Sequence, residues 1–99
     1  MHRMAIQYGQ PSDTAAFDAR YRDEHVALAQ ALPGLRRFTT SHPRALRGEA
    51  PYFVAELWFD DAASMKAAMK SPEMAATAAH AEGFDASMSI FTGEVVEAV

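Results

Sequence analysis

The chain of 99 residues contains no cysteine. Disulfide bonds, thiolate nucleophiles and cysteine-ligated zinc are therefore excluded, and this usage is typical of a cytoplasmic protein. The sequence also has no apolar run long enough for a signal peptide or a membrane span, so we expect neither. Its net charge is −4, without the concentrated basic patch that nucleic-acid binding requires, so we expect no nucleic-acid partner.

What is present is an ordinary globular composition. Hydrophobic residues make up 49% of the chain and charged residues 22%, which is typical of a folded domain and not of a disordered segment. A chain of this length forms one domain, here residues 1–99, because cores of this size rarely divide further. Such a domain buries roughly two thirds of its unfolded surface, enough for a modest core.

The first part of the chain predicts a strand and then an amphipathic helix. Apolar and polar residues alternate in "RMAIQYG", residues 3–9, as in a half-buried strand. Ser12 or Asp13 can cap the helix that follows, and Pro33-Gly34 ends it. The apolar face of this helix is predicted to carry Phe17, Tyr21, His25, Leu28 and Leu32.

The rest of the chain predicts three further strands and two helices. Residues 34–42 are extended, residues 43–51 form a polar loop, and "YFVAELWFD", residues 52–60, is a strand with two apolar faces. A helix begins at Asp60-Asp61, and another begins at Ser71-Pro72-Glu73 and runs to about Gly83. The apolar stripe of the first of these helices is predicted to be Ala62, Met65, Ala68 and Met69. Residues 87–99 are extended, with a kink or bulge expected at Gly93.

This order of elements, β-α-β-β-α-α-β, predicts an α+β fold. Right-handed crossovers around the helices give a ferredoxin-like split βαβ sandwich, in which a four-stranded antiparallel sheet carries its helices on one face. The other face of the sheet would then leave apolar side chains open to water. We therefore expect a homodimer through the open sheet face.

Four motifs give the chain a resemblance to a known family. They are Tyr21-x-x-x-His25, "LPGLRR" at 32–37, "AELWFDD" at 55–61 and "SPE" at 71–73. In this order the chain resembles the EthD family, named for ethyl tert-butyl ether degradation, from residue 4 to about residue 96. The resemblance implies a dimeric α/β barrel in which each protomer holds a small ligand between sheet and helices. Its superfamily includes quinone-forming monooxygenases, polyketide cyclases, muconolactone isomerases and haem-degrading enzymes, so the fold leaves the reaction open.

The chain departs from the family pattern at one position. Where relatives often carry an aspartate ahead of the last strand, this chain has His80 before Gly83-Phe84. If that carboxylate matters in relatives, this protein either has a different activity or has none. His80 alone could ligate a haem, but its spacing does not match that of the haem-degrading relatives, and we expect no such group.

His25 is the candidate catalytic residue. Imidazole titrates near neutral pH, so a histidine facing the sheet can take a proton from a phenol or an acidic C–H and return it. The alternative is a structural His25 that satisfies a polar atom within the helix–sheet interface. The resemblance at Tyr21 and His25 adds weight to the catalytic role.

Several other residues are candidates for substrate binding. Tyr21 and Tyr8 can hydrogen-bond a ligand oxygen, although buried tyrosines usually fill cores. The apolar candidates for the pocket wall are Phe17, Phe38, Trp58 and Met69, residues that also suit an ordinary core. Glu56 shares a strand face with Trp58, and we expect it to pair with an arginine, Arg36 or Arg37.

Metal and nucleotide sites are not predicted. The four histidines have no ligand spacing among them, and the sequence has neither a glycine-rich phosphate loop nor a Ser-His-Asp pattern. Two functions remain open. The first is a cofactor-independent enzyme of oxygenase, decarboxylase or isomerase type that acts on an apolar aromatic or polyketide-like compound with His25 as general acid/base. The second is a non-catalytic accessory or stress-associated dimer that binds a small-molecule ligand.

Overall fold

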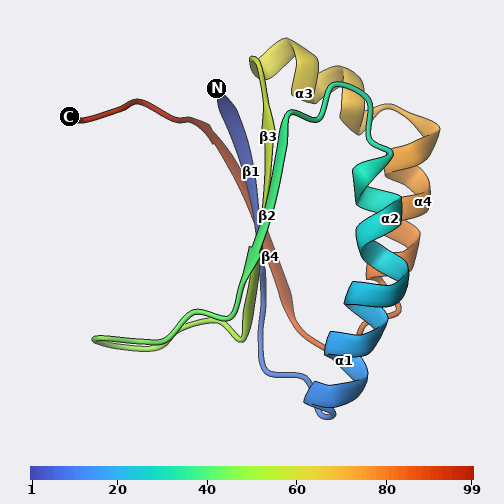
Figure 1. The fold of residues 1–99 in the computed structure, drawn as a ribbon, viewed down its shortest axis with the longest axis vertical. Helices are drawn as coiled ribbons and strands as arrows, with labels where there is room; N and C mark the ends of the chain where they lie inside the picture. The colour runs from blue at the N-terminus through green and yellow to red at the C-terminus, as the bar shows by residue number, and fades with distance from the viewer.

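A computed structural model describes residues 1–99, and Figure 1 shows a sheet with all helices on one side. The strands are β1 (His2–Tyr8), β2 (Arg37–Ser41), β3 (Phe53–Phe59) and β4 (Met88–Glu94). The helices are α1 (Thr14–Arg20), the π-helical turn η1 (Tyr21–His25), α2 (Val26–Gln30), α3 (Ala62–Met69) and α4 (Pro72–Ala81). None of these helices has the length and apolar character that crossing a membrane requires.

The four strands form one antiparallel sheet in the order β2-β3-β1-β4. In the register of this sheet, Ile6 lies between Ala55 and Ile90. The pairing of β1 with β4 is regular along its length, and Gly93 lies opposite Arg3 within it. The bulge expected at Gly93 is therefore wrong. A glycine in an edge strand leaves the ladder intact when no change of direction is needed there.

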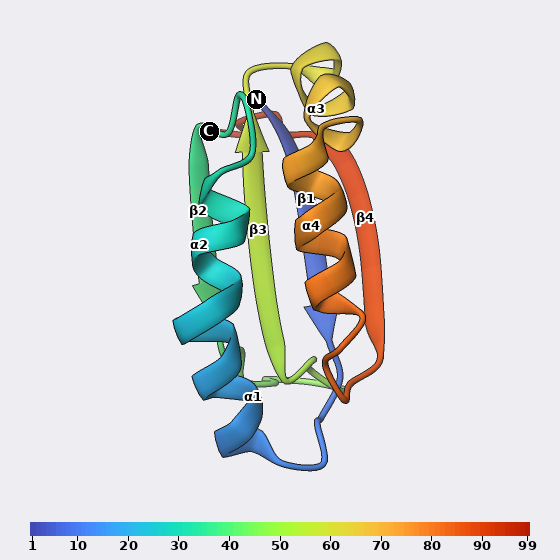
Figure 2. The ribbon, with the colours of Figure 1, turned by 90° about the vertical axis from the view of Figure 1, so that its right-hand side faces the viewer.

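The helices form a single layer. In Figure 2, the α1–η1–α2 segment and α4 lie side by side along the sheet, α3 lies at one end, and β4 runs along the edge beyond the helices. The predicted ferredoxin-like sandwich, with a four-stranded antiparallel sheet and helices on one face, is confirmed.

The helices α1, α3 and α4 begin where their capping residues predict. The Asp13 carboxylate accepts a hydrogen bond from the backbone N–H of Ala16 at 3.0 Å. The Asp61 carboxylate accepts one from Ser64 at 2.8 Å, and the Ser71 hydroxyl accepts one from Met74 at 3.1 Å. These side chains satisfy N–H groups that have no partner within the helix.

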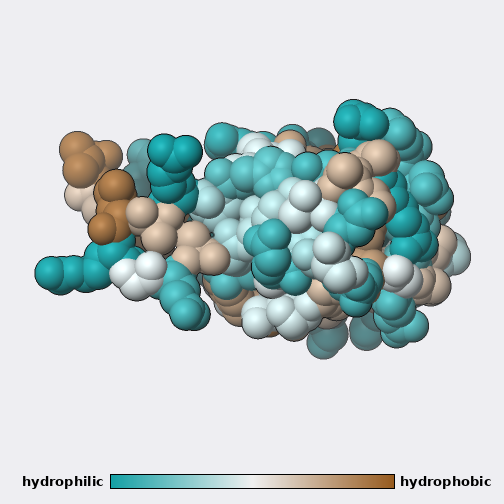
Figure 3. Space-filling view, turned by 90° about the horizontal axis from the view of Figure 1, so that it is seen from below, coloured by the Kyte–Doolittle hydropathy of each residue, from teal (hydrophilic) through white to brown (hydrophobic).

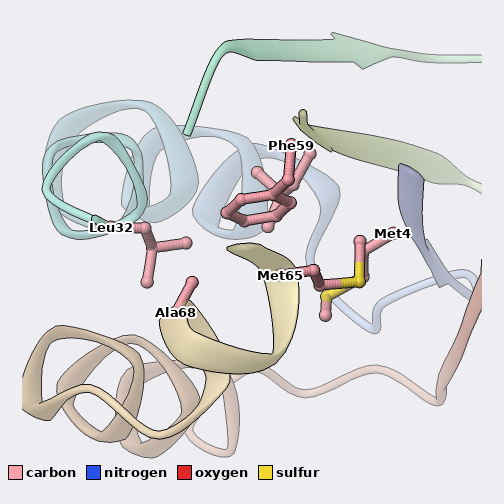
Figure 4. Close-up of a cluster of buried hydrophobic side chains, with 6 residues drawn as sticks. Met4, Leu32, Phe59, Met65 and Ala68 are labelled. Atoms are coloured by element: carbon pink, nitrogen blue, oxygen red, sulfur yellow. The ribbon is translucent and has the colours of Figure 1, made fainter. Parts of the chain in front are cut away.

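The core lies between the sheet and the helices in two clusters. The first consists of Met4, Leu32, Leu57, Phe59, Met65 and Ala68, five of which Figure 4 labels. The second consists of Tyr8, Phe17, Tyr21, Phe53, Ala55 and Phe84. Met69 belongs to neither and is 53% exposed. The predicted stripe of this helix is wrong at Met69 and also at Ala62, which is exposed, because the short α3 turns only Met65 and Ala68 toward the sheet.

The first helical segment contains a π-helical turn that the sequence did not predict. The N–H of Val26 donates to the carbonyl of Tyr21, five residues earlier. The wider turn changes which residues face the sheet, because each i→i+5 bond inserts one residue into the α-helical pattern. As a result Ala29 is buried and Leu28 is only half-buried. The predicted place of Leu28 on the buried stripe is therefore wrong, whereas Phe17, Tyr21, His25 and Leu32 are buried as expected.

Candidate functional site

A small apolar cavity lies between α4 and the sheet. Its volume is about 140 Å³. It is lined by Met4, Ile6, Tyr8, His25, Leu57, Met74, Thr77, Ala78, Ala81, Glu82, Met88 and Ile90. Met88 and Ile90 on β4 are exposed, so the cavity opens toward the edge of the sheet that no helix covers (Figure 2).

The π-helical turn η1 directs His25 into this cavity wall. His25 is 3% exposed, and its ring lies 4.8 Å from the ring of Tyr21 and 5.3 Å from that of Phe84, centroid to centroid. The extra residue in the turn keeps Tyr21 and His25 above Ala29 on one face, and π-helical turns frequently occur at functional sites.

His25 is hydrogen-bonded to a second histidine. Its Nδ1 lies 2.8 Å from the Nδ1 of His80 on α4. The Nε2 of His80 lies 3.4 Å from a carboxylate oxygen of Glu24, which is at the long end of the range for a hydrogen bond. The side chain of His80 is 14% exposed and that of Glu24 is 60% exposed. The three residues thus connect the cavity wall to the solvent.

The surroundings of His25 keep its imidazole neutral. Burial, together with the smaller effects of the His80 and Arg20 charges, lowers the pKa of His25 to about 4. The structure gives the Nε2 of His25 no hydrogen-bond partner. Among the fully buried side-chain nitrogen and oxygen atoms, only Trp58 Nε1 lacks a partner, so the Nε2 of His25 is not fully buried. The Nε2 of His25 therefore retains contact with accessible space and is the ring atom available to a ligand.

Tyr8 is the second sequence-predicted residue in the cavity wall. Burial raises the pKa of Tyr8 to about 12, and burial likewise raises the pKa of Tyr21. Both phenols are therefore protonated at neutral pH, as a hydrogen-bond donor to a ligand oxygen must be. Tyr8 lines the cavity, whereas Tyr21 lies behind His25 and lines a separate surface cleft beside His42.

The other predicted binding residues lie outside the cavity. Phe17 belongs to the second core cluster, which is mostly aromatic, and lines a shallow cleft beside Arg20. Phe38 packs against both core clusters, and Met69 faces solvent on α3. Of the seven candidates, only Tyr8 and His25 therefore line the cavity, although Tyr21 packs against the rings of both.

Trp58 lies on the open face of the sheet, away from the helices. The guanidinium groups of Arg3 and Arg37 lie 5.7 Å and 5.1 Å from the centre of its ring. Glu56 on the same face forms an ion pair with Arg3 at 3.0 Å. The expected pairing of Glu56 with Arg36 or Arg37 is wrong, because Glu56 pairs with Arg3 of β1, whereas Arg36 pairs with Asp60 and the Arg37 guanidinium lies over the Trp58 ring.

The sequence analysis missed the contribution of α4 to the cavity. Met74, Thr77 and Ala81 follow one another at helical spacing, and Phe84 continues the series after the helix ends. This stripe predicts that the neighbouring His80 lies at the border of the buried face of α4. No local pattern could show that His80 meets His25, because 55 residues separate them.

No group of three or more His, Cys, Asp or Glu side chains is placed to hold a metal ion.

Fold and site together define a class of protein: a ferredoxin-like α+β domain with a small apolar cavity between the sheet and its helices. The chain belongs to the EthD family, because the EthD domain model matches residues 10–86. An uncharacterized 11.0 kDa protein from the thcB-thcC intergenic region of Rhodococcus erythropolis is 38% identical over 86 residues, 85% of this chain and 84% of that one. The motifs quoted from the sequence thus identified the family correctly.

Solved structures share the fold. An EthD family protein from Bacillus halodurans superimposes with a TM-score of 0.87 and 28% identity, covering 97% of this chain and 99% of that one. SnoaB, a cofactor-independent oxygenase from Streptomyces nogalater, gives a TM-score of 0.74 at 14% identity, over 99% of this chain and 95% of SnoaB. A dimeric ferredoxin-like protein of unknown function from Thermobifida fusca also gives 0.74, at 15% identity, over 95% and 90% of the two chains. The last two likenesses show the fold alone.

Proposed function

We propose that this protein binds a small apolar compound with one oxygen-bearing group in the cavity under α4, and that His25 is the general acid/base in its conversion. One observation carries the proposal: a buried, neutral imidazole with a free Nε2 lines a cavity that is otherwise almost entirely apolar. Such a cavity with few polar groups is the usual form of a small-molecule site.

The size of the cavity restricts the class of ligand. A buried cavity of about 150 Å³ holds a benzene molecule, and this one measures about 140 Å³. A single aromatic ring therefore fits, and a substituent can extend past Met88 and Ile90 at the open edge. A phenol or a related monocyclic compound is the substrate class we propose, in place of a larger polyketide-like compound.

The chemistry follows from the protonation states of the wall. The Nε2 of His25 can accept a proton from the ligand hydroxyl or from an acidic C–H and return it to another atom of the ligand. Tyr8 supplies a protonated phenol in the same wall. The reaction class is the cofactor-independent oxygenase, decarboxylase or isomerase type, and the fold shared with SnoaB does not decide among these three.

A second function is favoured by the packing around His25. Its ring packs against Tyr21, Phe84 and His80, as expected of a histidine that stabilises the core. The protein would then bind the same ligand as an accessory or stress-associated protein, without transferring a proton.

Binding can be tested by NMR titration with phenol. We expect phenol to shift the signals of His25, Met88 and Ile90 and to leave those of His2 and His42 unchanged. Ala78→Phe fills the cavity mouth, whereas Ala79→Phe makes the same change at the neighbouring exposed position of α4 that does not line the cavity. Ala78→Phe should abolish the shifts and Ala79→Phe should preserve them. Equal responses in both variants, or no response of the wild type at millimolar phenol, would exclude the cavity as the site.

We also propose that two copies associate through the open sheet face. That face carries Trp58, Val54 and Phe91, and Phe91 is 46% exposed. The segment between β2 and β3 and the C-terminal tail both project on this side of the sheet (Figure 1). Seen from below, this projecting side carries hydrophobic residues among hydrophilic ones (Figure 3), and the exposed apolar residues of the two segments are Leu46, Val96 and Val99. A second copy would cover these side chains.

A further inference from the structure

The bond between His25 and His80 allows only one hydrogen atom. Two Nδ1 atoms 2.8 Å apart cannot both carry a proton, and without one they would place two lone pairs in contact. Whichever histidine donates is therefore protonated at Nδ1, and the other must accept there. Because a neutral imidazole carries a single proton, this choice also fixes the state of the opposite ring nitrogen, Nε2.

Glu24 determines the direction of this bond. Its carboxylate can only accept, and it faces the Nε2 of His80. It therefore favours a proton on the Nε2 of His80. When His80 is neutral, its Nδ1 is then the acceptor and His25 donates from Nδ1. The Nε2 of His25, the atom that no protein group engages, is left with its lone pair free.

We propose that Glu24, His80 and His25 form a proton relay between the cavity and the solvent. This inference rests on the proposed function, because the relay exchanges protons with a ligand bound beside His25. Nothing in the local sequence assigns a role to His80 or Glu24, and both act here as positioning residues because neither lines the cavity.

The transfer balances as a movement of two protons. The ligand gives a proton to the Nε2 of His25 and becomes an anion. The proton on the Nδ1 of His25 passes to the Nδ1 of His80. His25 is again neutral, now protonated at Nε2, and His80 is an imidazolium beside the Glu24 carboxylate. The reverse transfer returns a proton from the solvent side to the ligand.

The relay places the positive charge where the protein can accommodate it. A cation on His25 would be buried beside the Arg20 guanidinium, whose charge opposes it. A cation on His80 lies nearer the solvent and faces Glu24. The other groups around the pair are the protonated phenols Tyr8 and Tyr21 and the Glu82 carboxylate at the end of α4. When the two proton transfers are concerted, His25 exchanges a proton with the ligand without holding a net charge.

The ligand-free protein provides the test. Nitrogen-15 NMR distinguishes a protonated from an unprotonated ring nitrogen in each histidine. At pH 8 we expect His25 to be protonated at Nδ1 and bare at Nε2. As the pH falls, its proton should move to Nε2 with the same midpoint as the protonation of His80, while His25 stays neutral. A His25 that is protonated at Nε2 at pH 8 would overturn the relay.

Three variants sharpen the result. His80→Phe should remove the tautomer change at His25 and leave only the direct protonation of that ring. Glu24→Gln, at an exposed position that does not endanger folding, should lower the midpoint, because it removes the negative charge that faces the His80 imidazolium. Glu73→Gln makes the same substitution in the first turn of α4 and should leave the midpoint unchanged. A midpoint that responds equally to Glu24→Gln and Glu73→Gln would also overturn the relay.

These outcomes are separable from those of the proposed function. If the tautomer change follows His80 but phenol does not bind, the relay is present and the proposed ligand site is wrong. If phenol binds and the tautomer of His25 ignores His80, the ligand site stands and the relay is wrong.

Discussion

The neutral state of His25 makes the stability of the protein depend on pH. An unfolded histidine titrates near pH 6.5, whereas burial lowers the pKa of folded His25 to about 4. Between these values the unfolded chain binds a proton that the folded chain does not. The free energy of unfolding must therefore decrease as the pH falls from about 6.5 to 4.

This decrease can be measured against a variant that cannot titrate. From pH 7 to pH 4.5, His25 should reduce the free energy of unfolding by about 2 to 3 kcal/mol. His25→Phe keeps an aromatic ring in the core and removes that dependence, so urea denaturation across the range should show a shallower decline for the variant. Parallel declines in the two proteins would mean that His25 is charged in the folded state.

At the scale of single residues, the sequence could predict burial but not partners. His25 and Tyr21 follow Phe17 at helical spacing, and all three are buried. The partners of His25 and Glu56, by contrast, come from other elements, α4 and β1. Arg3 and Glu56 are 53 residues apart, so the neighbours of Glu56 in sequence cannot show which cation it meets.

At the scale of the elements, the π-helical turn decides which side chains reach the core. In an uninterrupted α-helix Leu28 would be deeply buried, and its truncation to Ala would cost roughly 2 to 5 kcal/mol. In this structure Ala29 is 2% exposed and Leu28 is half-buried. We therefore expect Leu28→Ala to cost only about 1 kcal/mol, whereas Ala29→Leu overpacks the core and costs roughly 1 to 3 kcal/mol.

Thermal or chemical denaturation of these two variants tests the turn. Ala27→Leu adds the same bulk at an exposed position and should leave the free energy of unfolding nearly unchanged. The turn would be contradicted if Leu28→Ala were the more damaging change and Ala29→Leu as harmless as Ala27→Leu.

The element boundaries were predictable to different degrees for a physical reason. The start of a helix depends on residues close together in sequence. Asp61 and Ser71, for example, each accept a hydrogen bond from the backbone N–H three residues later. The π-helical turn has no comparable local signal. It is favoured by the packing of Tyr21 and His25 against the aromatic cluster, which exists only in the folded protein.

At the scale of the whole molecule, one layer of helices leaves the sheet with two unlike faces. The helix face is covered, apart from the cavity that opens at β4 and the cleft beside His42. The open face combines polar and charged residues with apolar ones, among them the ion pair of Arg3 and Glu56 beside Trp58 and Phe91. A face of this kind suits association of two copies better than continued exposure to water.

Sedimentation equilibrium at micromolar concentration tests the proposed homodimer. The wild type should have a mass near twice the 10.8 kDa of a single chain. Phe91→Asp introduces a charge into the proposed interface, on the edge strand β4, and should weaken association by more than about 100-fold, since an unpaired buried charge costs several kcal/mol. Met69→Asp makes the same change at a side chain of similar exposure, 53% against 46%, but on the helix layer, and should remain a dimer. A wild-type mass near that of one chain would exclude the homodimer, and equal dissociation of both variants would move its interface away from the open sheet face.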